Sequence, residues 1–139
     1  MILKSYEVEK KNFLSTKKKM FLLYGENNGL KKDIKKMIKL SMQTEVDKIE
    51  EVTVIENEII KNEENFYNLI FSPSLFSEKK IILVHNATDK IIAIIKNIEV
   101  KFPEDVFIVF LSDILDKKSK LRAFFETNKQ IACIPCYLD

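Results

Sequence analysis

Three short apolar runs constrain the fold of this chain more than any other feature. They are Met20–Tyr24, Ile81–Val84 and Val106–Phe110, and no charged side chain interrupts any of them. Continuous apolar character is typical of strands that are buried on both faces, as in parallel sheets. In half-exposed strands, apolar and polar residues alternate. The runs therefore predict strands over residues 20–24, 80–85 and 105–110, in a mostly parallel sheet covered by helices on both sides.

Helical spacing of apolar residues occurs between the predicted strands. A helix is predicted over residues 30–41, with an apolar face made of Leu30, Ile34, Met37, Ile38 and Ser41. The lysines at 31, 32, 35, 36 and 39 are expected on its other, solvated face. Further helices are predicted within 59–70 and over 87–100 and 115–128, and further strands over 51–55 and 130–134. Residues 1–9 show the alternation of a strand and are interpreted as a short lead-in. Alternating strands and helices favour right-handed βαβ crossovers.

Length and composition are those of one folded domain. Of 139 residues, 46% are apolar and 32% charged, so we expect a single domain over residues 1–139. The net charge is +2 and Arg122 is the single arginine, which gives little signal for nucleic-acid binding. Without a membrane-length apolar run or an export signal, a cytoplasmic protein is expected. Because the sequence stops four residues after Pro135, we expect a fragment of a longer protein.

The turn after the first predicted strand lies where α/β proteins bind phosphate. A phosphate loop reads GxxxxGK[ST], but here Gly25 and Gly29 are only four positions apart. Leu30 takes the place of the phosphate-binding lysine, and Lys31 takes the place of the hydroxyl residue. Glu26 adds a carboxylate where anionic oxygens would lie. We interpret Gly25, Gly29 and Lys31 as a non-functional nucleotide loop that forms a tight turn and starts a helix.

The segment before the strand at 80–85 carries two large apolar residues among turn-forming residues. Residues 72–77 read SPSLFS, so Leu75 and Phe76 follow a proline and lie between serines. Two interpretations are open from these residues alone. The two side chains either pack into the core of the domain or stand out as apolar anchors for a pocket on a partner.

The other residues with chemical potential favour structural roles. Cys133 and Cys136 form a CxxC pattern, but a zinc site needs a second ligand pair, so we expect buried, reduced thiols. His85 is the only histidine, and no recognisable catalytic constellation surrounds it, so a capping or solvent role is expected. No catalytic residue, metal site or cofactor is assigned. The lysine face of the helix over 30–41 is compatible with either DNA phosphates or solvent.

The order of these features resembles the N-terminal domain of the delta subunit of bacterial DNA polymerase III, a clamp-loader subunit. Three parts of the chain carry the resemblance: residues 21–27 (FLLYGEN), residues 74–84 (SLFSEKKIILV), and residues 117–122 with 134–137 (KKSKLR and IPCY). The first is similar to the family's first strand and degenerate nucleotide loop. The second is similar to its clamp-binding element, and the third to its closing helix and strand.

The resemblance implies a fold, a partner and a role. The fold would be the AAA+ α/β module, a five-stranded, mostly parallel sheet flanked by helices. Ser74, Leu75 and Phe76 would bind the beta sliding clamp and help to open it for loading onto primed DNA. The delta subunit does not hydrolyse ATP, so no enzymatic activity is expected of this chain within the polymerase complex. The other loader subunits (gamma or tau, and delta prime) would contact domains that this sequence lacks.

Two other classes of protein are alternatives. A P-loop nucleotide-binding or NTPase domain shares the strand–turn–helix arrangement, and it predicts binding of ATP with magnesium at residues 25–32. A receiver-like domain needs an acidic pair after the first strand, where this chain has Tyr24 and Gly25, so this class is disfavoured.

Overall fold

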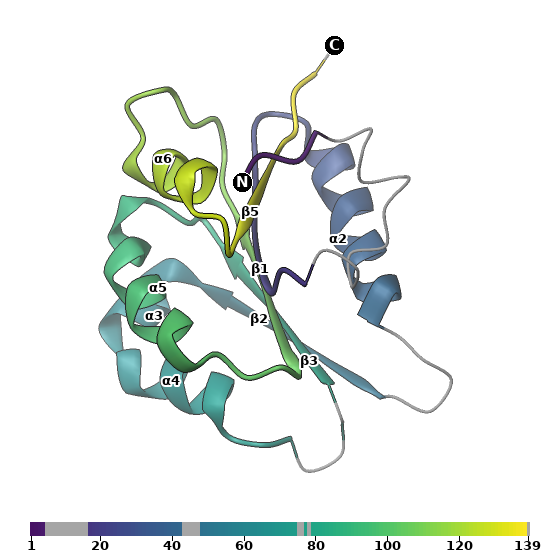
Figure 1. The fold of residues 1–139 in the computed structure, drawn as a ribbon, viewed down its shortest axis with the longest axis vertical. Helices are drawn as coiled ribbons and strands as arrows, with labels where there is room; N and C mark the ends of the chain where they lie inside the picture. The colour runs from purple at the N-terminus through teal and green to yellow at the C-terminus, as the bar shows by residue number, and fades with distance from the viewer. Residues whose placement is uncertain (5–16, 43–47, 75–76, 78, 139) are drawn as a thin grey trace.

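The computed structural model describes residues 1–4, 17–42, 48–74, 77 and 79–138 of the chain. Strands and helices alternate along these residues (Figure 1). The strands are β1 (Met20–Tyr24), β2 (Ile49–Ile55), β3 (Lys79–His85), β4 (Val106–Leu111) and β5 (Ala132–Pro135). The helices are α2 (Asn28–Met42), α3 (Glu56–Lys61), α4 (Glu63–Phe71), α5 (Ile92–Ile98) and α6 (Lys120–Thr127), with 3-10 turns η2 (Asp89–Ile91) and η3 (Glu99–Lys101) flanking α5.

The five strands form one parallel sheet in the order β2-β3-β4-β1-β5. β1 lies between β4 and β5, so that Leu22 pairs with Phe110 on one side and with Cys133 on the other. The crossover from β1 to β2 therefore runs in the opposite direction to the crossovers that follow it. Because such crossovers are right-handed, α2 lies on one face of the sheet and the later helices lie on the other.

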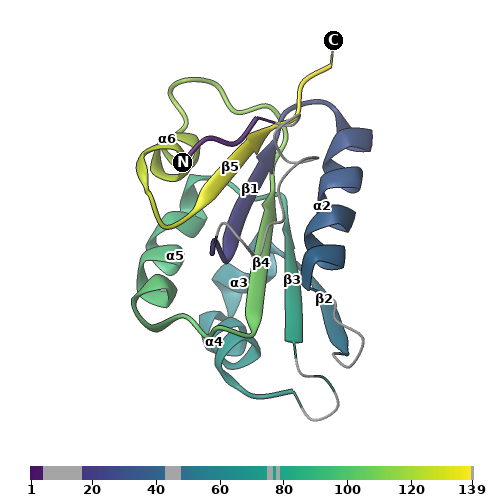
Figure 2. The ribbon, with the colours of Figure 1, turned by 45° about the vertical axis from the view of Figure 1, so that its right-hand side comes forward.

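The two faces of the sheet form separate apolar cores. Figure 2 shows α2 against one face and α3 to α6 against the other. Residues of β1 alternate between the cores, since Leu22 packs on the side of α3 to α6 and Phe21 and Leu23 pack on the side of α2. Every residue of β1 and β4 is buried, which explains why their sequences contain no charge. The predicted fold class, a five-stranded parallel sheet flanked by helices, is confirmed.

The first residues of the chain extend the sheet beyond β5. The Leu3 N–H donates to the Cys133 carbonyl at 2.8 Å, and the Cys133 N–H donates to the Met1 carbonyl at 2.9 Å. Ile2 consequently forms a parallel bridge with Cys133. Residues 1–9 show strand-like alternation in the sequence, and of the described residues 1–4 Ile2 forms an isolated bridge.

The helix predicted over residues 87–100 is present, but it starts later than predicted, because the helical turns of η2, α5 and η3 run from Asp89 to Lys101. After β3 the chain bends at Asn86, whose φ is +58°, and the Ala87 N–H then donates to the Leu111 carbonyl at 3.0 Å. The Thr88 N–H and hydroxyl both donate to the buried Glu56 carboxylate, at 2.8 and 2.7 Å. These contacts delay the first helical turn to Asp89, and regular α-helix begins only at Ile92.

The last predicted helix and strand are also corrected. α6 begins at Lys120 rather than Leu115, because the Ser119 hydroxyl accepts the Arg122 N–H at 3.1 Å and caps the helix there. β5 spans Ala132–Pro135 instead of residues 130–134. Its register is determined by pairing with β1, which no local pattern reveals.

Candidate functional site

The two candidate functional segments lie at opposite ends of the parallel strands, one at the carboxyl ends and the other at the amino ends. The β1–α2 turn follows the carboxyl end of β1, next to the ends of β3 and β4 (Figure 1). The segment between α4 and β3 leads into the amino end of β3. In open α/β sheets, small ligands bind at the carboxyl edge. A partner bound at the amino edge of the sheet would not cover the small-ligand position at the carboxyl edge.

The segment predicted to bind a partner joins the end of α4 to the start of β3. Leu75 and Phe76 lie outside the described residues, so their role stays a prediction. Ser74 and Ser77 flank them and are partly buried. The Ser74 hydroxyl donates a hydrogen bond to the Glu50 carboxylate of β2. The residue just before the predicted anchors is therefore tied to the sheet by its side chain.

Two lysines at the start of β3 donate to backbone carbonyls at the ends of two helices. Lys80 is 7% exposed, and its Nζ donates to the carbonyls of Leu69 at 2.5 Å and Ser72 at 3.3 Å. The ammonium group thus satisfies carbonyls at the C-terminus of α4, where positive charge is favourable. Lys79 Nζ donates in the same way to the Met42 carbonyl at the end of α2, at 2.8 Å. The role of these lysines was not predicted from the sequence, although a charged pair that opens a buried apolar strand is a usable signal.

The surface next to this segment is partly apolar. Phe71, the last residue of α4, is 46% exposed. A cavity of about 230 Å³ lies beside it and is lined in part by Pro73, Ser74 and Pro103. An exposed aromatic ring and a hollow at the base of the segment offer apolar contact area to a partner.

The β1–α2 turn is tight and requires glycine at its first position. Gly25 has φ of +118°, a conformation that residues with a Cβ rarely adopt. Asn27 begins the helix, because its Oδ1 accepts the Leu30 N–H at 3.0 Å. Gly29 is already inside α2. The expected tight turn and helix start at Gly25 and Gly29 are confirmed.

Two backbone N–H groups of this turn are used within the protein. The Gly25 N–H donates to the Asp113 carbonyl at 3.0 Å, and the Asn27 N–H donates to the Cys136 carbonyl at 3.0 Å. In a phosphate loop the corresponding groups face the phosphate oxygens. The turn thus has the position of a phosphate loop in the fold, but these two N–H groups donate to carbonyls of the protein instead.

Residues after β5 also cover the side chains of the turn. The Glu26 carboxylate accepts the Leu138 N–H at 3.0 Å, and this hydrogen bond lowers the pKa of Glu26. The side-chain amide of Asn27 donates to the Tyr137 carbonyl at 3.3 Å. The last described residues therefore bind the side chains of the turn.

Lys31 is not on the solvated face where the helical pattern places it. It is 7% exposed, and its Nζ donates to the Ser112 carbonyl at 2.7 Å and to Asn28 Oδ1 at 3.3 Å. Ser112 follows β4 directly, so the ammonium group links α2 to the carboxyl edge of the sheet. A phosphate-binding lysine directs its ammonium group to the phosphates. The ammonium group of Lys31 instead binds acceptors of the protein itself.

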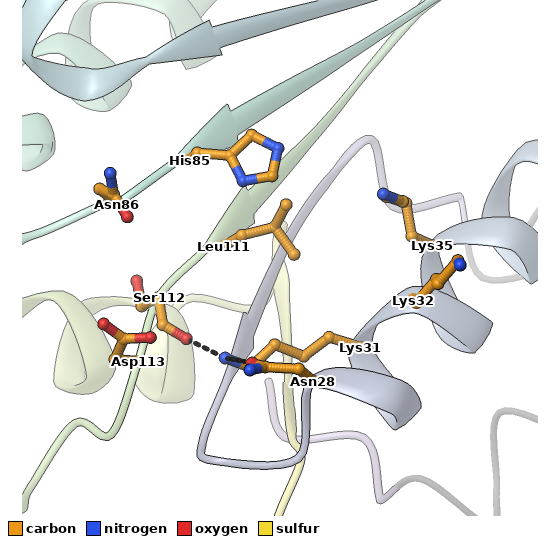
Figure 3. Close-up of a pocket in the computed structure, with 9 residues that line it drawn as sticks. All are labelled: Asn28, Lys31, Lys32, Lys35, His85, Asn86, Leu111, Ser112 and Asp113. Atoms are coloured by element: carbon orange, nitrogen blue, oxygen red, sulfur yellow. Dashed lines mark hydrogen bonds between the residues drawn. The ribbon is translucent and has the colours of Figure 1, made fainter.

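A cavity of about 300 Å³ opens between α2 and the carboxyl ends of β3 and β4 (Figure 3). It is lined by Asn28, Lys31, Lys32, Lys35, His85, Asn86, Leu111, Ser112 and Asp113. Burial, and then the positive charge of Lys35, lowers the pKa of His85. The expected capping or solvent role of His85 is thus refined, because the ring is only partly exposed and lines this cavity.

P-loop enzymes hold magnesium with a P-loop hydroxyl and an aspartate near the end of another strand. Here Lys31 occupies the hydroxyl position, and β3 ends at His85, which is followed by Asn86. The carboxylate that lines the cavity is that of Asp113, after β4. This donor set fits a magnesium nucleotide poorly.

Both cysteines are buried, free thiols, as expected. Burial raises the pKa of Cys133 and of Cys136 to about 11, so the thiolate forms are rare at neutral pH. Across the described ranges, no three His, Cys, Asp or Glu side chains gather as metal ligands. Among the same residues, no helix has the length and apolar character needed to span a bilayer.

The sheet order and the helix layers are those of an open α/β domain, and solved structures with a similar fold are known. The similar solved structures include the DNA clamp loader delta protein of Bacillus subtilis, with a TM-score of 0.63 and 14% identity over 96% of this chain and 42% of that one. A DNA polymerase III gamma subunit-related protein of Thermotoga maritima gives a TM-score of 0.47 and 16% identity over 97% of this chain and 45% of that one.

No family model and no curated protein matches this sequence. At 14% identity, the likeness to the delta protein establishes the fold, and it confirms at that level the resemblance seen in the sequence. The chain spans 42% of the length of that delta protein.

Proposed function

We propose that this chain is the clamp-binding domain of a delta-type clamp-loader subunit and that Leu75 and Phe76 bind the beta sliding clamp. The observation that carries the proposal is the position of these residues. The SLF sequence lies between α4 and β3 of a domain whose fold matches a DNA clamp loader delta protein. The clamp-binding element of the delta family, which residues 74–84 resemble, leads into a strand in the same way.

The anchoring of the segment supports this role. Lys80 holds the Ser72 carbonyl, and the Ser74 hydroxyl is bonded to Glu50, so the chain is held close to the residues that would bind. A segment held at its base loses less conformational freedom on association, which favours affinity. The exposed ring of Phe71 adds apolar surface beside it.

Binding alone is sufficient for the proposed task. Burial of a leucine and a phenylalanine side chain contributes about 3–6 kcal/mol before the costs of association. A protein that binds the opened ring more tightly than the closed ring shifts the clamp toward the opened form. No covalent chemistry is needed for this step.

The same proposal holds that this chain does not hydrolyse ATP. Its support is the turn at Gly25, whose N–H, like that of Asn27, is bonded within the protein. The ammonium group of Lys31 is bonded to Ser112, and residues 137 and 138 contact the turn. A magnesium nucleotide would have to displace these contacts.

The clamp proposal is tested with purified sliding clamp immobilised on a sensor surface. We expect the Leu75→Ala, Phe76→Ala double variant to bind about 100-fold more weakly than the wild type, because two anchor side chains are removed. A matched control is the Ile114→Ala, Leu138→Ala variant, since these apolar residues are 67% and 62% exposed at the opposite edge of the sheet. The control should bind like the wild type. Equal binding by all three proteins would contradict the assignment.

The alternative function, a P-loop nucleotide-binding or NTPase domain, makes a different prediction. Calorimetric titration with ATP and magnesium should give no binding heat and no released phosphate under the clamp proposal. Micromolar binding of ATP with magnesium, lost when the turn is mutated, would favour the NTPase instead. The irregular glycine spacing of the turn argues against that outcome.

The wider assembly belongs to the same proposal. Within a complete subunit the domain would act in the cytoplasm beside the gamma or tau and delta prime subunits, and would reach primed DNA through the complex. The chain covers 42% of the similar delta protein, so contacts with those subunits would fall largely to other domains.

A further inference from the structure

The two outer strands of the sheet differ in how they are covered. At β5, the backbone groups of Met1 and Leu3 are hydrogen-bonded to Cys133. At the opposite edge, β2 pairs with β3 alone among the described residues (Figure 2). The N–H and C=O groups on the outer side of such a strand are available to pair with another strand.

β2 lacks the features with which proteins usually block an exposed edge. It pairs with consecutive residues of β3 at every position, so it has no bulge, and its sequence IEEVTVI contains no proline and no lysine. Its two charged residues, Glu50 and Glu51, lie in its first half. In the uncharged second half, Thr53 is exposed and Ile55 is 40% exposed. This half of β2 is therefore open to strand addition.

A cavity of about 290 Å³ lies beside the same half of β2, next to α3 and α4. It is lined by the apolar side chains of Val54, Ile59, Phe66 and Leu69, and Glu58 and Asn65 are among its polar residues. Val54 packs against the core on this side of the sheet. Because the side chains of neighbouring strands align across a face, a strand added to β2 would place one side chain beside Val54 and over the cavity.

The surface around this cavity is acidic, although the chain as a whole has a net charge of +2. Residues 49–66 contain six glutamates and one lysine. Glu58 in α3 and Glu63 and Glu64 at the start of α4 are exposed. A partner with positive side chains would complement this surface.

We propose that the outer side of β2 binds an extended, basic segment of a partner protein, which adds a strand to the sheet and inserts an apolar side chain into the cavity. Backbone hydrogen bonds to β2 supply affinity, and the cavity and the glutamates select the side chains. A second copy of this chain could also add its β2 strand, but that pairing brings two acidic surfaces together. The inference does not depend on the clamp proposal, because the residues that carry it lie in β2, α3 and α4.

The proposal is tested with two short synthetic peptides, one in which lysine and valine alternate and one in which glutamate and valine alternate. Each is titrated into the isotope-labelled protein and followed by NMR. We expect the basic peptide to shift the amide signals of residues 52–55 in a saturable way. It should also slow hydrogen exchange on the outer side of β2, because those N–H groups become hydrogen-bonded. The acidic peptide should bind at least about tenfold more weakly.

Two matched pairs of variants separate a site from a general charge effect. Thr53→Lys places a lysine on the open edge and should weaken binding of the basic peptide by about tenfold. Thr127→Lys adds the same charge at an exposed position of α6 and should bind like the wild type. Glu58→Gln should weaken binding by about threefold, whereas Glu104→Gln, exposed and outside the cavity, should leave it unchanged. Circular dichroism verifies that all four variants are folded.

Several outcomes would overturn the proposal. They are no saturable binding of the basic peptide, equal affinity for the two peptides, or wild-type binding by Thr53→Lys. Dimers of the free protein in sedimentation analysis that Thr53→Lys abolishes would also overturn it and would assign the edge to a second copy. All four variants should bind the sliding clamp like the wild type, so failure here is distinguishable from failure of the clamp proposal.

Discussion

Gly25 and Cys136 are in such close contact that no side chain fits between them. A Cβ at position 25 would lie 2.1 Å from the Cys136 carbonyl oxygen. The Cys136 N–H also donates to the Tyr24 carbonyl at 2.6 Å, so the two segments are joined on both sides of the glycine. The contact connects the first strand to the residues after the last strand and closes the turn where a phosphate loop would open.

Gly25→Ala should therefore destabilise the domain. We expect a loss of about 2–4 kcal/mol in the free energy of unfolding, because the new methyl group meets backbone and the positive φ is strained. Gly29→Ala is the matched control: its Cβ would meet Asn27 Oδ1 at an ordinary 3.6 Å, inside α2. That change should stabilise by about 0.5–1 kcal/mol. Urea unfolding of both variants checks the pair, and equal effects would contradict the close contact.

Lys31→Met should also lower the free energy of unfolding, by about 1–3 kcal/mol, because it leaves the Ser112 carbonyl without this donor. Lys36→Met, on the exposed side of the same helix, should change stability by less than about 0.5 kcal/mol. Thermal unfolding followed by circular dichroism measures both. If the two substitutions had the same small effect, the buried position of the Lys31 ammonium group would be wrong.

The thiols of Cys133 and Cys136 should be unreactive in the folded protein. Their pKa values of about 11 leave few thiolates at pH 8, and both side chains are buried. A thiol reagent such as 5,5′-dithiobis(2-nitrobenzoic acid) should label the native protein only as fast as it unfolds. Addition of guanidinium chloride should expose both thiols within the mixing time. Rapid labelling without denaturant would show that one of them is accessible.

His85 should make stability depend on pH below neutrality. Burial and Lys35 lower its pKa in the folded state, so the unfolded chain takes up the proton first as the pH falls. The stabilising contribution is complete above about pH 6.5 and is lost as the pH falls toward the lower folded-state pKa. His85→Gln should remove this part of the pH dependence, as measured by urea unfolding of both proteins across the range. Parallel curves for the two proteins would be inconsistent with the shift.

Ser74→Ala tests whether the segment is held in place for binding. The substitution removes the hydrogen bond to Glu50, and we expect a stability loss of about 0.5–1.5 kcal/mol. Under the clamp proposal, affinity for the clamp should fall by about threefold to tenfold, because the segment is less ordered before binding. Ser72→Ala is the control, since this side chain is exposed and only its carbonyl is bonded to Lys80. A clamp affinity unchanged by Ser74→Ala would show that the bond to Glu50 has no role in binding.

Much of the fold is predictable because a strand that is buried on both faces is apolar at every position. β1 and β4 are apolar at every position, and their places in the chain were sufficient to predict a parallel sheet. The glycine spacing likewise predicts a defective nucleotide loop without any structure. Helix ends were less predictable, because Ser119 and Glu56 set them through specific hydrogen bonds to Arg122 and Thr88.

Local patterns in the sequence determined the strands, the crossovers and the failure of the phosphate-loop motif, because each depends on residues that are near neighbours in the chain. Only the tertiary structure decided that Lys31 is buried against Ser112, that Cys136 closes the turn at Gly25, and that Lys80 holds the end of α4. The first two contacts join residues far apart in sequence. A helical pattern assigns a lysine to the solvated face, but the direction of its ammonium group depends on which carbonyl a distant strand presents to it.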